Sequence, residues 1–205
     1  MCTPHPTLPA QATLKVDLLP RRKMLVTAAA ALAGCTLGVA QAQTQASPIW
    51  PEVNSALAEA RLAGSIRLRV WGFEVYDAQL WVLPGFRAGQ FAQYPLALSL
   101  RYLRSLKGAA IAEHSLKEMR GVGPIAPAQA DPWLRAMTQT FPDVQAGDRL
   151  TGLHQPGVGA RFWLNGQPHG DIADANFSSA FFGIWLAEGT SEPAMRRELL
   201  ANAAP

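Results

Sequence analysis

The amino-acid sequence predicts an α+β fold, because its strand-like and helix-like segments are grouped rather than strictly alternating. Residues 64–82, GSIRLRVWGFEVYDAQLWV, are rich in β-branched and aromatic side chains, contain no proline and are typical of two strands. A later segment places four apolar residues on one helix face, namely Phe177, Phe181, Ile184 and Trp185. Grouped elements of this kind favour an α+β domain over an alternating parallel sheet.

Capping, turn and periodicity signals predict the elements in order. Proline in a first turn and glycine after a last turn mark helices, whereas apolar–polar alternation marks strands. The segments expected to be helical are 50–63, 108–120, a helix that opens at Asp131-Pro132, 173–186, and a last helix that starts around Thr190 and runs through Leu200. The segments expected to be strands are the two of the hairpin, 95–103, 148–154, 160–164 and a short one near Asp171-Ile172.

The hairpin is expected to fold back at Trp71-Gly72, and its register suggests a candidate site. A two-residue loop would pair Val70 with Phe73, Leu68 with Val75, Arg69 with Glu74 and Arg67 with Tyr76. One face would then be apolar, and the other would carry Arg67 beside Tyr76. A guanidinium beside a phenol can hold a carboxylate or an enolate oxygen. The same pair would also be ordinary on a solvated strand, so both interpretations stay open.

Residues 1–42 are expected to be an export signal. Arg21-Arg22-Lys23 precedes an alanine-rich apolar run, and Ala40-Gln41-Ala42 offers a small-x-small cleavage site. The arginine pair also resembles a twin-arginine signal. In the alternative interpretation, Leu32-Ala33-Gly34-Cys35 resembles a lipobox, and Cys35 would carry a lipid anchor. Either way we expect a periplasmic domain over residues 43–205, in contact with the membrane only through the signal or this anchor.

Charge and cysteine content exclude several classes of function. The chain has 18 basic and 15 acidic residues, but the leader holds the whole excess, which leaves 14 of each from Gln43 onward. A nucleic-acid-binding surface is therefore not expected. Both cysteines, Cys2 and Cys35, lie in the leader, so the domain offers no thiol chemistry. The sequence has no phosphate loop, serine-nucleophile motif or HExxH pattern, and no cofactor or metal is expected.

Three segments of the sequence resemble the bacterial chalcone isomerase-like domain family: GFEVYDAQLWV, FPDVQAGDRLTGLHQPGVGARFWLNGQ and FSSAFFGIWLAEGTSEPAMRRELL. The resemblance covers roughly residues 49–200. It implies the chalcone isomerase fold, an open-faced β-sandwich in which a large antiparallel sheet packs against a layer of helices, with a ligand cleft between the sheet and the helices. Relatives include plant chalcone isomerases, which close a chalcone to a flavanone, and plastid fatty-acid-binding proteins.

The resemblance also implies roles for individual residues. Arg67 matches the family arginine that stabilises an oxyanion in the enzymes and pairs with a carboxylate in the fatty-acid binders, with Arg69 as the alternative. Tyr76 matches the tyrosine of the binders. Thr190 or Ser191 matches a hydroxyl residue of the enzymes. Where the enzymes carry a tyrosine, this sequence has Ile111, and Tyr102 lies earlier on the third strand as a further ligand-binding candidate.

These residues predict a binding protein rather than an enzyme. We expect a small amphipathic or fatty acid, held by Arg67 and Tyr76, with its tail among apolar helix residues. The first alternative is an intramolecular lyase or isomerase acting on a chalcone-like phenolic enone, with Arg67 stabilising an oxyanion. The second is a non-enzymatic interaction module of the cell envelope.

Overall fold

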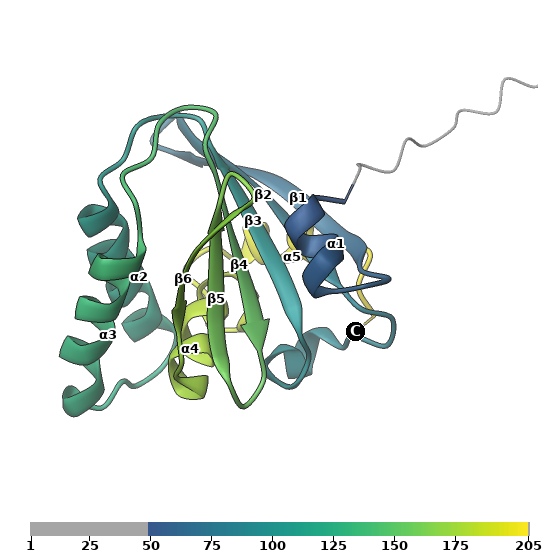
Figure 1. Ribbon diagram of the computed structural model, residues 1–205. Coiled ribbons are helices and arrows are strands. Elements are labelled where there is room, and N and C mark those ends of the chain that lie inside the picture. Colours follow the sequence, from purple (N-terminus) through teal and green to yellow (C-terminus); the bar gives the residue numbers. More distant parts are fainter. Residues whose placement is uncertain (1–48, 205) are drawn as a thin grey trace, which may run out of the picture. The chain divides into compact units, whose positions relative to one another are not determined.

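The computed structural model describes residues 49–204, and Figure 1 shows their helices and strands. The export signal and Cys35 lie outside the described residues. The helices are α1 (Pro51–Ala56), the 3-10 segment η1 (Ala88–Gln93), α2 (Gly108–Val122), α3 (Pro127–Thr140), α4 (Ala175–Leu186) and α5 (Pro193–Leu199). The strands are β1 (Arg61–Val70), β2 (Phe73–Val82), β3 (Leu96–Tyr102), β4 (Arg149–Gln155), β5 (Gly159–Leu164) and β6 (Gln167–Ile172).

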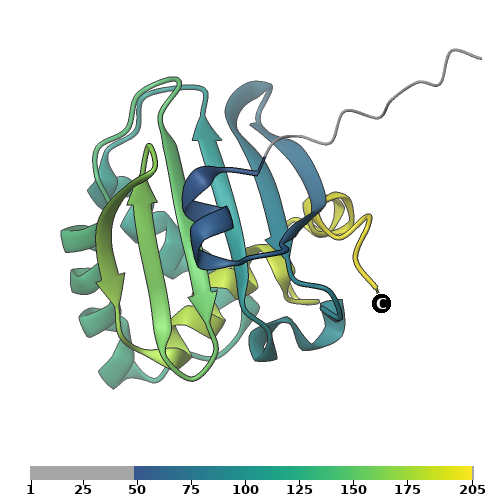
Figure 2. The same ribbon diagram turned by 45° about the vertical axis from the view of Figure 1, so that its right-hand side comes forward.

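The six strands form one antiparallel sheet in which neighbours in the chain are neighbours in space. Figure 2 shows this meander nearly face-on, from β1 at one edge to β6 at the other. The β1–β2 turn, the end of β3 and the start of β4 lie at the same end of the sheet, and the β4–β5 turn lies at the opposite end. Each strand therefore pairs with its neighbours in sequence, the commonest arrangement for consecutive strands.

The helices divide unequally between the two faces of the sheet. Helices α2, α3, α4 and α5 lie on one side, which we call the inner face, and α1 lies on the other, the outer face (Figure 1). Under α1, a small apolar cluster joins Val53 and Leu57 to Trp81, Leu153 and Trp163 of the sheet. The larger core lies on the inner face. This arrangement confirms the predicted α+β class and the open-faced layering.

Helix α4 supplies the apolar stripe that was expected from the sequence. Phe177, Phe181, Ile184 and Trp185 are all buried within the core. Asp174 caps the helix, since its carboxylate accepts hydrogen bonds from the backbone N–H groups of residues 176 and 177 at 2.8 and 2.9 Å. These hydrogen bonds lower the pKa of Asp174 against the opposing effect of its partial burial. The cap and the stripe together fix α4 against the sheet.

Three element boundaries differ from the expectation. The first helix ends at Ala56 rather than near residue 63, because β1 already begins at Arg61. Helix α3 begins at Pro127, so Pro132 lies inside it instead of opening it. The position is tolerated, although the ring removes one backbone hydrogen bond. The last strand extends over Gln167–Ile172 and is longer than the short segment predicted. No helix within residues 49–204 is long and apolar enough to cross a membrane.

Candidate functional site

A β-bulge in the first hairpin decides which side chains share a face. The structure confirms the turn at Trp71-Gly72 and the pairing of Arg69 with Glu74. Beyond the Arg69–Glu74 pair, however, Val75 is an extra residue in β2 and the register shifts. Leu68 therefore lies opposite Tyr76, and Arg67 lies opposite Asp77. A bulge inserts one extra residue into one strand and changes where the following side chains point. The predicted pairing of Arg67 with Tyr76 is therefore wrong.

Arg67 lies on the outer face, where carboxylates already hold it. Its Nε donates to Asp77 at 2.6 Å, and its Nη1 lies 3.1 Å from both carboxylate oxygens of Glu74. Arg69 and Arg101 bind the same two carboxylates at 2.8 and 2.6 Å. The hydrogen bond from Arg67 lowers the pKa of Asp77, and hydrogen bonds from Arg69 and Arg67 lower that of Glu74. Arg67 and Arg69 thus belong to a partly solvated ionic network.

Tyr76 lies on the inner face, in a cavity between the sheet and the helices that we call the inner pocket. The pocket has a volume of about 370 Å³, at the small end of the size range of small-molecule sites. Its walls come mainly from β1–β4, α2 and α4. The apolar and aromatic side chains that line it are Leu68, Val70, Trp71, Phe73, Val75, Tyr76, Leu100, Tyr102, Leu106, Ile111, Phe141, Leu150, Phe181, Ile184 and Trp185. Because of the bulge, Val75 and Tyr76 both face this pocket.

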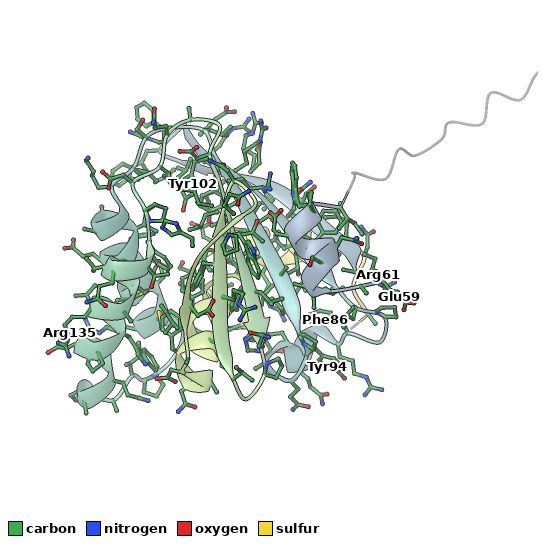
Figure 3. All side chains as sticks on the ribbon, in the orientation of Figure 1. Glu59, Arg61, Phe86, Tyr94, Tyr102 and Arg135 are labelled. Atoms are coloured by element: carbon green, nitrogen blue, oxygen red, sulfur yellow. The ribbon has the colours of Figure 1, made fainter. Side chains whose placement is uncertain are left out.

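Two tyrosines supply phenol groups to the inner pocket. Tyr76 and Tyr102 meet edge to face, with ring centroids 6.1 Å apart. Figure 3 labels Tyr102, near the end of β3 that leads toward α2. Burial raises the pKa of both phenols, so each stays protonated at neutral pH. Tyr76 accepts a hydrogen bond from Trp185 Nε1 at 3.0 Å and donates to the sulfur of Met195 at 3.8 Å.

The mouth of the inner pocket carries one arginine that the sequence analysis overlooked. Arg104 lines the pocket, and its guanidinium lies 5.7 Å from the centroid of the Phe73 ring. Among residues 49–204, Arg67, Arg69 and Arg101 form ion pairs with carboxylates, whereas Arg104 forms none. The sequence indicates the side on which Arg104 lies through the two-residue alternation of the third strand. Arg104 continues the alternation of Leu100 and Tyr102, which points it to the same side of the sheet.

Three further polar side chains line the pocket from α2, namely His114, Ser115 and Glu118. His114 Nε2 is 3.9 Å from the carboxylate of Glu118, and both residues line the pocket. The hydroxyl of Ser191 donates to Glu118 at 2.5 Å, which connects the predicted Ser191 to the pocket indirectly. Thr190 instead donates to the carbonyl of Ile184 at 2.6 Å and is buried in the loop before α5. Neither Thr190 nor Ser191 lies among the residues that line the pocket.

Ile111 lies in the inner pocket, in the region where the plant enzymes were expected to carry a tyrosine. Its side chain adds apolar surface and no proton donor. Within the described residues, no group of three or more His, Cys, Asp or Glu side chains has the geometry to hold a metal ion. The pocket thus combines apolar walls and two phenols with the polar side chains of Arg104, His114, Ser115 and Glu118.

A large antiparallel sheet, a helical layer on one face and an apolar pocket between them define a chalcone isomerase fold. The comparisons agree. The family model described as chalcone isomerase-like matches residues 62–201, and the chain belongs to this family.

Two known proteins illustrate the relationship. A Haemophilus influenzae protein described as uncharacterized is 33% identical over 133 residues, which cover 64% of this chain and 64% of that protein. The crystal structure of the Arabidopsis thaliana fatty-acid binding protein AtFAP1 matches with a TM-score of 0.57 at 13% identity. That match covers 71% of this chain and 89% of the plant chain. At this identity the likeness shows the fold alone.

Proposed function

We propose that this protein binds a small amphipathic or fatty acid in the inner pocket and does not act on it chemically. The apolar tail would lie among the pocket's leucine, isoleucine and aromatic side chains, and the carboxylate would lie at the mouth. Burial of the tail supplies most of the affinity, at about 0.8 kcal/mol per methylene removed from water. The structural similarity to a fatty-acid binding protein supports this ligand class.

The observation that carries the proposal is the position of Arg104. A guanidinium at the mouth of an apolar pocket, with no carboxylate partner among residues 49–204, has all its donors available for an anion. Arg67 was the expected anchor, but Asp77 and Glu74 already occupy its donors on the opposite face. We therefore assign the anion-binding role to Arg104 in place of Arg67.

The two tyrosines support binding rather than proton abstraction. Since burial raises the pKa of Tyr76 and Tyr102, both phenols can donate hydrogen bonds but cannot serve as bases near pH 7. Thioether sulfur is a weak acceptor, so the Tyr76 proton could move from Met195 to a better acceptor on a ligand. The expected Tyr76–ligand hydrogen bond thus stays part of the proposal. Ile111, which offers no proton donor, weighs against the isomerase alternative.

We further propose that the domain acts outside the cytoplasm. This rests on the Arg21-Arg22-Lys23 segment, the apolar run and the Ala40-Gln41-Ala42 site, with lipidation at Cys35 as the alternative outcome. Cell fractionation of a bacterium that expresses the full chain, followed by mass measurement of the mature chain, tests it. A chain that begins after Ala42 supports soluble export, a lipidated Cys35 supports an anchored protein, and an intact chain in the cytosol contradicts both.

Direct binding measurements with Arg104→Gln and Arg67→Gln test the ligand assignment. The probe is a saturated fatty acid of medium chain length, and its methyl ester serves as the uncharged control. We expect Arg104→Gln to weaken binding of the acid by about tenfold, the size of one charge-assisted hydrogen bond, and to leave the ester nearly unchanged. Arg67→Gln should change neither affinity, because Arg67 faces the outer side of the sheet.

Several outcomes would contradict the proposal. If neither probe binds the wild-type protein, the pocket does not take fatty acids. If Arg67→Gln weakens binding and Arg104→Gln does not, the sequence-based assignment is right and the structural one is wrong. Turnover of a chalcone by the wild-type protein, measured by absorbance, would favour the isomerase alternative.

A further inference from the structure

The turn of the first hairpin holds apolar side chains in solvent. Val70, Trp71 and Phe73, which with Gly72 we call the hairpin tip, are 42%, 95% and 65% exposed. The other large apolar residue with comparable exposure among those described is Val158, at 59%, on the β4–β5 turn at the opposite end of the sheet. Trp71 is also the exposed member of the six tryptophans, since the other five are buried or half-buried. The tip therefore concentrates exposed apolar surface at one point.

The backbone at the tip is unusual as well. Trp71 has a φ of 49° and Gly72 a φ of 82°, the left-handed conformations of a tight hairpin turn. Asparagine, aspartate and glycine adopt this conformation readily, whereas a tryptophan does so at a free-energy cost of about 1 kcal/mol. The first position of the turn thus carries a residue that neither turn propensity nor solvation favours. Backbone strain clusters at functional sites, so an exposed aromatic residue held in a strained conformation points to a role beyond folding.

The tip is continuous with the inner pocket. Val70, Trp71 and Phe73 all line the pocket, and the guanidinium of Arg104 lies over the Phe73 ring. An aromatic pair beside an unpaired cation is the combination found where proteins meet the interface of a lipid bilayer. The guanidinium complements the phosphate groups of lipid headgroups, while the rings suit the boundary between headgroups and acyl chains.

We propose that the hairpin tip docks on the surface of a phospholipid bilayer and that a lipid-derived acid passes from the bilayer into the inner pocket along Phe73 and Arg104. This inference rests on the proposed function of the pocket. The exposed apolar area of the tip is on the order of 400 Å², judged from the size of aromatic side chains. A stable dimer would need roughly 800 Å² on each partner, so a second copy fits the tip less well than a bilayer does.

Vesicle binding tests the docking step. The experiment uses the purified protein in a Cys35→Ala background, which removes the candidate lipid attachment residue, with vesicles of phosphatidylcholine and phosphatidylglycerol. Insertion should shift the Trp71 emission to shorter wavelength, and brominated lipids should quench it. We expect Trp71→Ala with Phe73→Ala to lower vesicle partitioning by about tenfold or more, which corresponds to losing the burial of these rings. Val158→Ala, on the distant turn, should bind vesicles like the wild type.

Uptake of the fatty-acid probe separates this inference from the proposed function. Because Trp71 and Phe73 also line the pocket, the affinity of the tip variant for probe added from free solution is measured first. Docking predicts that the rate of uptake from loaded vesicles falls by about tenfold beyond any loss of that affinity. If wild-type and tip variant partition equally into vesicles, or if wild type does not bind them, the docking inference is overturned while the pocket proposal stands. If vesicles bind but no probe enters the pocket, the proposed function fails and lipid transfer fails with it. A tip-dependent dimer in analytical ultracentrifugation, without vesicle binding, would replace the bilayer by a second copy.

Discussion

The indole N–H of Trp185 on α4 donates a hydrogen bond of 3.0 Å to the hydroxyl of Tyr76 on β2. Both residues line the inner pocket, and their hydrogen bond joins the helical layer to the sheet at β2, the strand that contains the bulge. Trp185 is 5% exposed, so its N–H group has little access to water as an alternative acceptor. The position of Tyr76 in the pocket thus depends on α4 as well as on its own strand.

Tyr76→Phe should destabilise the protein by about 1–3 kcal/mol, because it leaves the buried Trp185 N–H without an acceptor. Urea unfolding measures the effect. Tyr94→Phe is the matched control. The Tyr94 ring packs against Phe86, so loss of the Tyr94 hydroxyl should change stability little. Equal effects of the two substitutions would show that the Trp185 hydrogen bond does not stabilise the fold.

Gly64 lets the last helix approach the first strand. A Cβ atom at this position would overlap the backbone carbonyls of Glu198 and Leu199 in α5. Because backbone cannot move aside as a side chain can, Gly64→Ala should lower stability by about 1–3 kcal/mol. Gly121→Ala, in α2 with open space around the new Cβ, should instead raise stability by about 0.5–1 kcal/mol. Thermal unfolding of both variants checks the opposite signs, and a neutral Gly64→Ala would refute the close approach.

The layered fold could be predicted from the sequence because its signals are local. Alternation marked the strands, and the spacing of Phe177, Phe181 and Trp185 marked the buried face of α4. The site was harder to predict from the sequence than the fold was, because the bulge at Val75 depends on pairing between two strands. A local sign of it exists. Val75 and Tyr76 are adjacent apolar residues, and the apolar positions change phase there, from 73 and 75 to 76, 78 and 80.

Arg104 could have been found because it continues the alternation of Leu100 and Tyr102 two residues past the end of β3. Its lack of a carboxylate partner among residues 49–204 could not have been found from the sequence. Whether an arginine is paired depends on carboxylates brought from other strands, as Asp77 and Glu74 are brought to Arg67. The sequence alone placed Arg67 beside Tyr76, whereas the bulge puts Arg67 opposite Asp77 and leaves Tyr76 in the inner pocket. Residues that share a face across a bulge can be assigned only when the register is known.

Arg149 compensates a buried carboxylate on the outer face. Glu52 of α1 has a side chain only 1% exposed, and its Oε1 accepts hydrogen bonds from Arg149 at 2.8 and 3.0 Å and from Thr151 at 2.9 Å. Arg149→Met would leave this carboxylate buried without its cation, so we expect a loss of about 3–5 kcal/mol. Arg161→Met removes an exposed pair with Asp171 and should change stability by at most about 1 kcal/mol.

Adding Glu52→Gln to Arg149→Met distinguishes pairing from packing. If the loss in Arg149→Met arises from the uncompensated charge, the double variant should recover part of the stability in urea unfolding. If it arises from the contact of the guanidinium with the Trp50 ring, 3.8 Å away, the second substitution should restore nothing.

His154 is fully buried on β4 and links it to η1 and α4. Its Nε2 lies 3.0 Å from the carbonyl oxygen of Ala92, and its Nδ1 lies 2.6 Å from the hydroxyl of Ser178. A carbonyl oxygen only accepts, so Nε2 carries the proton and Nδ1 accepts from Ser178. Burial lowers the pKa of His154, against the smaller opposing effect of the Ala92 hydrogen bond. The folded protein therefore holds this imidazole neutral.

The lowered pKa makes stability depend on pH in a defined direction. In the unfolded chain the imidazole takes up a proton below its ordinary pKa of about 6.5, whereas the folded state resists that proton. Stability contributed by His154 is thus present above about pH 6.5 and falls as the pH decreases, by up to about 1.4 kcal/mol per pH unit. Urea unfolding between pH 7.5 and 5.5 measures the slope, above the range in which Asp77 and Asp174 become protonated. His154→Gln keeps polar groups at the site but cannot titrate, so it should lose most of the slope. A slope that persists unchanged in His154→Gln would mean that another group carries the pH dependence.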